Sequence, residues 1–362
     1  MVRKSVVAGF VLLLLQTGVF VTPGLAQQAT NNPSLPHIIV LTTGGTIAGK
    51  ASGSSAIGYQ AGALSGADLV AAVPGLDKLA VVSVERIAQI PSQDMNDKVW
   101  FDLARRINEI SEKNEADGVV ITHGTDTMEE TAFFLSLVLN TEKPVVLVGA
   151  MRPSTATSAD GPENLYEAVE VAASPQARGR GVLVVLNDTI HSARSVAKSN
   201  TTSVQTFVDP NGAPAGYVDP ASVRFTTPVA ASERAPHALP SAPPLPRVDI
   251  IYAHANMDAA LIDDAVKGGA KGLVLAGVGD GNASQAVIDA LANAAKQGVV
   301  VVRASRTWSG FVNRNVEVDD DKLGFAASLD LNPQKARVLC QLLIANGVTN
   351  PRDIQNAFVG TW

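Results

Sequence analysis

Short runs of apolar and β-branched residues alternate along the chain with longer stretches in which apolar residues recur every three or four positions. The short runs predict buried strands, and the longer stretches predict helices. Strands are expected at residues 37–41, 79–84, 118–122, 145–148 and 181–186, with helices that include 98–110 and 129–139. Strands that are apolar throughout and alternate with helices are typical of a mostly parallel sheet covered by helices on both faces. The pattern therefore predicts an α/β fold.

A proline-rich segment at residues 235–247 interrupts this pattern. Its prolines are too many for a helix or a central strand, so it predicts a stiff linker. The pattern then resumes, with strands expected at 248–252, 272–276 and 299–303 and helices at 259–266, 284–295 and, as the last element, 333–346. The sequence thus predicts a larger N-terminal domain over 35–234 and a smaller C-terminal α/β domain over 248–362.

The first 26 residues have the pattern of an export signal. Arg3 and Lys4 precede an apolar run over 6–21, and the small residues Gly24 and Ala26 fit cleavage after Ala26. An uncleaved anchor is the alternative, but the run is shorter than the ~20 residues that a spanning helix needs. No later stretch is long and apolar enough to cross a bilayer. We expect an exported chain of about 336 residues with no membrane partner after signal removal.

The charge balance excludes one class of partner. Without Arg3 and Lys4, 26 basic side chains stand against 34 acidic ones. Nucleic-acid binding needs a basic face, so no nucleic-acid partner is expected. Cys340 is the only cysteine, which rules out a disulfide within the chain. It lies on the apolar face of the helix expected at 333–346, so we assign it to the core and not to chemistry.

The first candidate motif is Thr42-Thr43-Gly44-Gly45-Thr46-Ile47-Ala48-Gly49-Lys50, directly after a predicted strand. Its paired glycines let the backbone approach a ligand closely and place the Thr46 hydroxyl at the strand end. A phosphate-binding loop is a rival interpretation, because Gly44, Gly49 and Lys50 have its spacing. Ala51 stands where that loop needs a serine or threonine, which disfavours it. A purely structural turn stays open for this motif alone.

The second candidate motif is Ile121-Thr122-His123-Gly124-Thr125-Asp126-Thr127-Met128-Glu129-Glu130, again a strand, a tight turn and a helix. Asp126 with Glu129, or Thr127 with Glu130, has the spacing of a helix capping box. Only one of the two can cap the helix. The other side chain is free to point toward a site, where a carboxylate binds an ammonium group and a hydroxyl enters acyl chemistry.

With these two turns, the chain resembles the bacterial type II L-asparaginases, which are exported members of the asparaginase/glutaminase family. The matching blocks are Thr43 to Gly49, Ser92 to Asp97, His123 to Glu130, Gly149 to Pro153, Ser158 to Pro162, Gly181 to Asp188 and Asn332 to Arg337. Several long blocks in the right order are far more specific than one short pattern. The resemblance covers essentially all of the expected mature chain and implies a periplasmic enzyme.

The resemblance also implies roles for individual residues. It implies catalytic roles for Thr46, Tyr59, Thr125, Asp126, Lys198 and Glu317. It implies substrate-binding roles for Gly45, Ser92, Gln93, Gly124, Thr125, Asp126, Asn256 and Glu317. Thr46 matches the family nucleophile, and Lys198 matches the lysine paired with Thr125. Asn256 and Glu317 match residues that a neighbouring subunit contributes, which implies a homotetramer, arranged as a dimer of dimers with shared active sites.

An aliphatic hydroxyl is almost never ionised at neutral pH, so each threonine needs a group that accepts its proton during attack. Lys198 is the candidate partner for Thr125, because a lysine kept from water loses its proton more readily, although nearby Asp126 opposes this. Tyr59 beside Glu317 is the analogous pair for Thr46, and rests on the resemblance alone. Tyr59 lies within the glycine- and serine-rich segment 49–66, which has the composition of a mobile lid or of an ordinary surface loop.

The expected reaction is hydrolysis of L-asparagine to L-aspartate and ammonia through a threonine acyl-enzyme, without cofactor or metal. Gln93 stands where glutaminase-leaning relatives carry glutamate, so we expect weaker L-glutaminase activity. A periplasmic amino-acid binding protein, which would not consume its ligand, is the alternative. A zinc amidohydrolase is disfavoured, because the chain's five histidines are scattered without metal-ligand spacing. His123 is expected to bond backbone groups in its turn.

Overall fold

The computed structural model describes residues 35–51, 59–60, 62, 64–219, 221–229 and 237–360, the side chains of 51, 59 and 60 excepted. The predicted export signal lies outside the described residues, as do residues 52–58, 61 and 63 of the predicted lid. From Leu35 onward the chain forms one compact unit. It is built on an eight-stranded and a four-stranded sheet, with two small two-stranded sheets beside them. No described helix combines the length and apolar character needed to span a membrane.

The larger sheet has a parallel part of five strands and an antiparallel part of three. Its parallel strands, in spatial order, are β4 (Val81–Ile90), β1 (His37–Gly44), β5 (Gly118–Thr122), β6 (Val145–Val148) and β7 (Val182–Leu186). The antiparallel strands β8 (Thr189–Ser192), β11 (Gly216–Asp219) and β12 (Ser222–Phe225) continue the sheet beyond β7. All parallel strands therefore end at the same edge.

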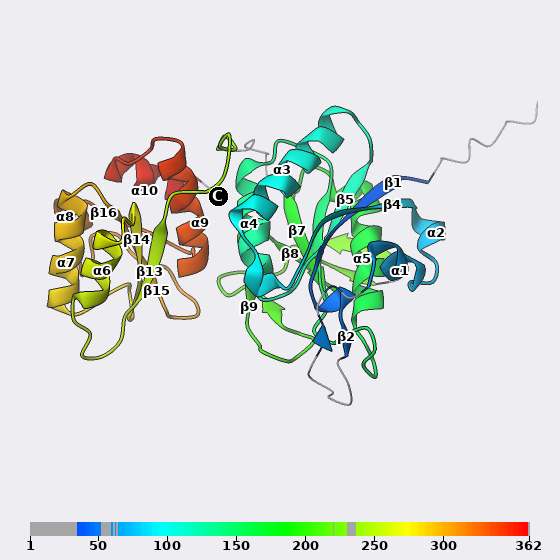
Figure 1. Ribbon diagram of the computed structural model, residues 1–362, viewed down its shortest axis with the longest axis horizontal. Helices are drawn as coiled ribbons and strands as arrows, with labels where there is room; N and C mark the ends of the chain where they lie inside the picture. Colours follow the sequence, from blue (N-terminus) through cyan, green and yellow to red (C-terminus); the bar gives the residue numbers. More distant parts are fainter. Residues whose placement is uncertain are drawn as a thin grey trace, which may run out of the picture. The chain divides into compact units, whose positions relative to one another are not determined.

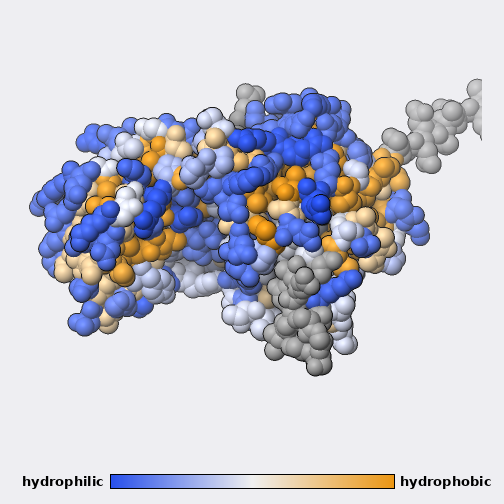
Figure 2. Space-filling view, viewed as in Figure 1, coloured by the Kyte–Doolittle hydropathy of each residue, from blue (hydrophilic) through white to orange (hydrophobic). Residues whose placement is uncertain are grey.

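Helices cover both faces of the larger sheet. On β1, Ile39 and Leu41 belong to a core cluster with α3 (Asp97–Glu112) and α4 (Met128–Val138), whereas the alternate residues Ile38 and Val40 pack with α5 (Gly161–Ala173). Figure 1 shows α3 and α4 on one side of the strands and α5 on the other. The outer side of α3 is hydrophilic (Figure 2). Burial on two faces explains why these strands are apolar throughout.

The smaller sheet is parallel throughout. Its strands are β13 (Val248–Tyr252), β14 (Gly272–Gly277), β15 (Val300–Ser305) and β16 (Phe325–Ala327). The helices α6 (Ala260–Lys267) and α7 (Gln285–Lys296) cover one face, and α9 (Pro333–Ala345) covers the other. α9 also packs against α4 of the larger domain, so one hydrophobic cluster joins the two sheets. Cys340, fully buried in α9, is a core residue as predicted.

The predicted α/β fold is confirmed, with a larger mostly parallel N-terminal part and a smaller C-terminal one. The strands predicted at 118–122, 145–148 and 248–252 have the same bounds in the structure. The helix expected at 333–346 is not the last element, because α10 (Pro351–Gly360) follows it. Asn350 starts that helix by accepting a hydrogen bond from the Arg352 backbone N–H at 2.9 Å. The short helices α1 (Gly66–Ala71), α2 (Leu76–Leu79) and α8 (Asp320–Leu323) complete the described helices outside the 3-10 turns.

The proline-rich segment has neither helix nor strand in its described part, residues 237–247. It nevertheless packs onto the larger domain. Leu245 is buried, and its backbone N–H donates to Asp97 Oδ2 at 2.8 Å. The expected domain boundaries on either side of this segment stay predictions.

Candidate active site

Three turns meet at the carboxyl edge of the larger sheet. Thr46 begins a 3-10 turn (Thr46–Ala48) that follows β1, and Ser92 begins another (Ser92–Asp94) that follows β4. Thr125 lies in the turn between β5 and α4. Because β1 pairs with both β4 and β5 in parallel, the three turns are neighbours. Ligands of open α/β sheets bind beyond the carboxyl ends of such strands.

Glycines allow these turns to touch. Gly45 has φ of 81°, in the left-handed region that favours glycine, and a Cβ on it would lie 2.4 Å from the Gly124 backbone N. A Cβ on Gly124 would lie 2.6 Å from Ser92 Oγ. Both distances are too short for any side chain. The predicted site residues Gly45, Gly124 and Ser92 are therefore brought together, with the Gly124 backbone against the Gly45 backbone and the Ser92 side chain.

Ser92 joins its turn to the Thr125 turn through two hydrogen bonds. Its Oγ accepts from the Asp126 backbone N–H at 3.2 Å, and its carbonyl oxygen accepts from Thr127 Oγ1 at 2.8 Å. Thr127 holds the N-cap position of α4, but no side-chain capping bond forms there. The predicted capping box is thus wrong, because the Thr127 hydroxyl is used on Ser92 instead of on the helix. Asp126 is free of a capping role as well.

Lys198 reaches Thr125 and Asp126 from outside the large sheet. It lies on β9 (Ala197–Lys198), which pairs antiparallel with β10 (Phe207–Val208). Its Nζ donates to Thr125 Oγ1 at 2.9 Å and to Asp126 Oδ1 at 2.5 Å. The Lys198 side chain is 17% exposed and that of Asp126 57% exposed, so the pair extends from the protein interior toward solvent. The three residues form a compact cluster of one hydroxyl, one amine and one carboxylate.

His123 links the Thr125 turn to α4. Its Nδ1 lies 2.6 Å from the Gly124 carbonyl oxygen, as predicted, and its Nε2 lies 2.9 Å from Thr131 Oγ1 on α4. Burial lowers the pKa of His123 to about 4, so the ring is neutral at physiological pH. A neutral imidazole with both nitrogens engaged serves structure rather than proton transfer.

A fourth turn, after β6, adjoins Thr125, and the sequence interpretation gave its residues no individual role. Thr125 Oγ1 contacts Met151 Sδ at 3.4 Å. The carboxylate of Asp160 accepts from the backbone N–H groups of Met151 and Arg152, each at 2.9 Å. Asn164 donates to the Gly149 carbonyl oxygen at 3.0 Å. The matching blocks contained Met151 and Asp160, but only the fold shows that Asp160 holds the Met151 turn against Thr125.

Thr46 is buried, with 6% exposure, at the start of its turn. The chain returns to this turn after β3 (Tyr59–Gln60), which pairs with β2 (Lys50–Ala51). The Gly62 backbone N–H donates to the Gly45 carbonyl oxygen at 3.2 Å. The Tyr59 backbone therefore lies near the Thr46 turn. The Tyr59 side chain and residues 52–58 are outside the described part of the chain.

The remaining predicted residues stand apart from the Thr125–Asp126–Lys198 cluster. Gln93 is exposed beside Ser92. Asn256 and Glu317 are exposed on loops of the smaller domain, and Glu317 accepts a hydrogen bond from Asn282. Within the described part of the chain, no hydrogen bond or ion pair joins Asn256 or Glu317 to Thr125, Asp126 or Lys198. The roles that the resemblance implies for Asn256 and Glu317 stay predictions.

Two family models match the chain, one for each sheet. A model described as "Asparaginase, N-terminal" matches residues 37–231, and one described as "Glutaminase/Asparaginase C-terminal domain" matches residues 247–358. The chain belongs to the asparaginase family. The predicted resemblance is confirmed, and the Thr46 and Thr125 turns fall within the matched N-terminal asparaginase region.

Individual asparaginases are similar over most of their length. A protein of Haemophilus influenzae named "Probable L-asparaginase periplasmic" is 48% identical over 92% of this chain and 96% of its own. L-asparaginase 2 of Escherichia coli is 48% identical over 90% and 93%. A glutaminase-asparaginase of Pseudomonas fluorescens is 40% identical over 98% of both chains.

A solved structure confirms the asparaginase fold. The crystal structure of a probable cytoplasmic L-asparaginase from Campylobacter jejuni superposes with a TM-score of 0.84 at 43% identity. The match covers 90% of this chain and 99% of that one. The names of these two relatives differ in compartment, since the Haemophilus influenzae protein is called periplasmic. Family membership alone therefore does not assign the compartment.

Proposed function

We propose that this protein hydrolyses L-asparagine to L-aspartate and ammonia, with weaker activity on L-glutamine. The single observation that carries this proposal is the position of Lys198 Nζ. It lies 2.9 Å from Thr125 Oγ1 and 2.5 Å from Asp126 Oδ1, and the turn that holds these two residues is next to the Thr46 turn. Cleavage of an amino-acid side-chain amide by a threonine uses a nucleophilic hydroxyl, a proton acceptor and an anionic group that binds the substrate ammonium. The convergence of these groups at one sheet edge, in a chain of the asparaginase family, supports this function.

In the proposed reaction, Thr46 Oγ1 attacks the side-chain amide carbon of asparagine. Backbone N–H groups near the Thr125 turn stabilise the tetrahedral oxyanion. The C–N bond breaks, ammonia leaves with the proton given up by the hydroxyl, and an ester to Thr46 remains. Water then attacks this ester, which releases aspartate and restores the hydroxyl. Lys198 and Thr125 relay protons in these steps, and Tyr59 does so for Thr46.

Substrate recognition is assigned to Asp126, Ser92 and Gln93. Asp126 holds the α-ammonium group, and Ser92 and Gln93 hold the α-carboxylate and α-amino groups. Binding the ammonium group also sets a second positive charge beside Lys198, which favours proton loss from that amine. One methylene separates glutamine from asparagine and is worth about 1 to 3 kcal/mol of discrimination, so glutamine is a poorer substrate but is not excluded.

We further propose a homotetramer in which a neighbouring subunit contributes Asn256 and Glu317 to each site. The exposure of both residues on the smaller domain supports this. We propose export to the periplasm after cleavage near Ala26, supported by the basic and apolar pattern of residues 1–26 and by the periplasmic Haemophilus influenzae relative.

Ammonia release from L-asparagine tests the function. The wild type should release ammonia catalytically, whereas an amino-acid binding protein would bind asparagine without consuming it. Thr46→Ala should lower turnover by roughly 10² to 10⁴. Thr42→Ala is a matched control, because Thr42 is another buried threonine near the end of β1, with its hydroxyl 3.5 Å from the Glu85 carbonyl. Wild-type turnover in Thr46→Ala would refute the assigned nucleophile.

A further inference from the structure

A buried lysine, Lys335, contacts the segment that leads to Lys198 of the candidate active site. Lys335 lies in the first turn of α9 and is only 2% exposed. Its Nζ donates to the carbonyl oxygen of Arg194 at 2.7 Å and also to that of Val196. Burial lowers the pKa of Lys335 to about 8. Burying an amine is costly unless it is hydrogen-bonded, and the Arg194 and Val196 carbonyl oxygens supply these bonds to Lys335.

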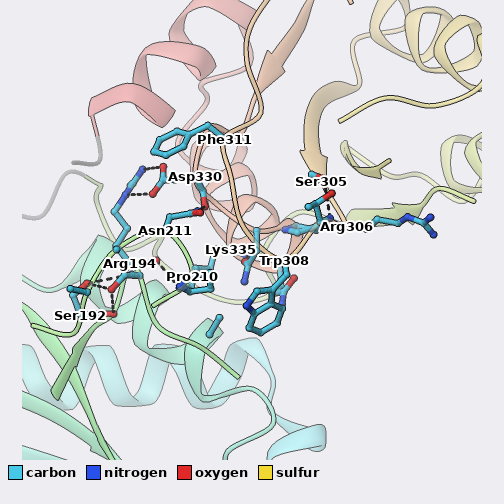
Figure 3. Close-up of a pocket in the computed structure, with 18 of the residues that line it drawn as sticks. Ser192, Arg194, Pro210, Asn211, Ser305, Arg306, Trp308, Phe311, Asp330 and Lys335 are labelled. Carbon is cyan, nitrogen blue, oxygen red and sulfur yellow. Dashed lines mark hydrogen bonds and ion pairs between the residues drawn. The ribbon is translucent and has the colours of Figure 1, made fainter. Parts of the chain in front are cut away.

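The segment that Lys335 holds leads directly to Lys198. Val196 lies two residues before it, between the end of β8 and the short strand β9. Arg194, on the same segment, forms a two-point ion pair with Asp330, at 2.9 Å from Nε and 2.6 Å from the terminal nitrogen. Figure 3 shows Arg194, Asp330 and Lys335 lining one cavity, with the Arg194–Asp330 pair marked by two dashed lines. The segment is therefore anchored twice by residues at or just before α9.

The same end of α9 also contacts the start of α4, the helix that follows the Thr125–Asp126 turn. Glu129, near the start of α4, accepts from Asn332 Nδ2 at 3.1 Å and from Gln334 Nε2 at 3.0 Å. The Thr125–Asp126 turn immediately precedes α4. The start of α9 thus contacts both the segment that leads to Lys198 and the helix that follows Thr125. The Lys198 amine and the Thr125 hydroxyl lie 2.9 Å apart.

We propose that Lys335 is a positioning residue, which together with the Arg194–Asp330 pair holds the 194–196 segment so that Lys198 reaches Thr125. The inference rests on the proposed function of Lys198. Lys335 touches neither Thr125 nor Asp126, and it acts only through the backbone that carries Lys198. Proton transfer is sensitive to placement, and a shift of about 1 Å can cost 10²-fold in rate. The effect should therefore fall on kcat, whereas substrate affinity changes little.

Lys335→Met tests the proposal, since methionine keeps the apolar stem and removes both donated hydrogen bonds. We expect kcat for asparagine to fall roughly 10- to 100-fold, with KM within about 3-fold of wild type. Gln341→Leu is the matched control. Gln341 is also 2% exposed on α9, and its Nε2 donates to the Pro246 carbonyl oxygen at 3.2 Å, away from the Lys198 segment. Its kcat should stay within about 2-fold of wild type.

A double variant separates positioning from general loss of structure. If Lys335 acts through Lys198, adding Lys335→Met to Lys198→Met should change the residual turnover by less than about 2-fold. A full additional loss in the double variant, or wild-type kcat in folded Lys335→Met, would overturn the proposal. Wild-type turnover in Lys198→Met would instead refute the proposed role of Lys198, which keeps the two failures distinct.

Asp330→Asn, a milder variant, tests the positioning proposal if Lys335→Met does not fold. Asp330→Asn keeps the volume of the side chain and weakens only the ion pair with Arg194. Circular dichroism should show an unchanged fold, and kcat should fall by about 3-fold or more without a matching rise in KM. An unchanged kcat in this variant would overturn the proposal.

Discussion

The Nζ of Lys198 donates a hydrogen bond to the hydroxyl of Thr125 at 2.9 Å. The two residues are far apart in the sequence, and they come from different sheets. Thr125 is fixed by the end of β5 and the start of α4, whereas Lys198 depends on a two-residue strand. The positions of Thr125 and Lys198 therefore have different structural explanations. The parallel sheet explains Thr125, and the contacts of α9 explain Lys198.

Asp126→Asn should weaken recognition of the substrate ammonium group. We expect KM for L-asparagine to rise about 10-fold or more, because a charge-assisted bond becomes a neutral one. Steady-state kinetics on asparagine and on succinamic acid, which lacks the α-amino group, check the cause. The variant and the wild type should differ far less on succinamic acid. An equal KM change on both substrates would show that Asp126 does not bind the ammonium group.

Gly45→Ala should destabilise the protein as well as inactivate it. The new Cβ would lie 2.4 Å from the Gly124 backbone N, at a φ of 81° that disfavours other residues. Overpacking and backbone strain together predict a loss of about 2 to 4 kcal/mol in the free energy of unfolding. Urea denaturation measures it. Gly212→Ala is the control, since a Cβ there meets nothing within 4 Å. Equal stability of the two variants would show that the Gly45 and Gly124 turns do not touch.

Glu167, on α5, predicts a pH-dependent stability. It is fully buried, one carboxylate oxygen lacks a hydrogen-bond partner among the described residues, and the other accepts from the Asp188 backbone N–H at 3.3 Å. Burial, and then the nearby Asp188 carboxylate, raise the pKa of Glu167 to about 8. A raised folded-state pKa means that the stabilisation is present below about 4.5 and is lost as pH rises through about 8.

Glu167→Gln should remove this loss. At pH 9 the variant should be more stable than the wild type by up to about 5 kcal/mol, at about 1.4 kcal/mol for each unit by which the pKa is raised, and at pH 4.5 nearly equal to it. Thermal or urea unfolding at the two pH values measures the difference. Glu112→Gln, an exposed change on α3, should show no such pH dependence. A constant difference between pH 4.5 and 9 for Glu167→Gln would contradict the account.

Much of the candidate site could be predicted because parallel strands that are buried on both faces leave a clear pattern. The runs at 118–122 and 145–148 are continuous and apolar, and the glycine-rich turns at their ends mark the sheet edge. Thr46, Ser92 and Thr125 follow three neighbouring strands, so their proximity follows from the order of the strands. Lys198 required the family resemblance, since a single lysine in a polar stretch looks like any surface lysine.

Other features depend on contacts between distant segments. The capping box at Asp126 and Thr127 failed because Ser92, 35 residues earlier than Thr127, offers a carbonyl that binds the Thr127 hydroxyl. The alternation of strands and helices predicts a helix before the strand at 181–186, but not that Asn164 on α5 holds the Met151 turn through Gly149. The short strands β8 to β12 carry too few residues for a periodic pattern. The buried use of Lys335 is invisible without the fold.

Turnover of L-asparagine by Lys198→Met tests the account most directly. Lys271→Met, at an exposed lysine of the smaller domain, is its control. We expect ammonia release at saturating asparagine to fall by roughly 10² or more in Lys198→Met, with an unchanged circular dichroism spectrum, and to stay at the wild-type rate in Lys271→Met. A folded Lys198→Met enzyme that releases ammonia as fast as the wild type would contradict the account.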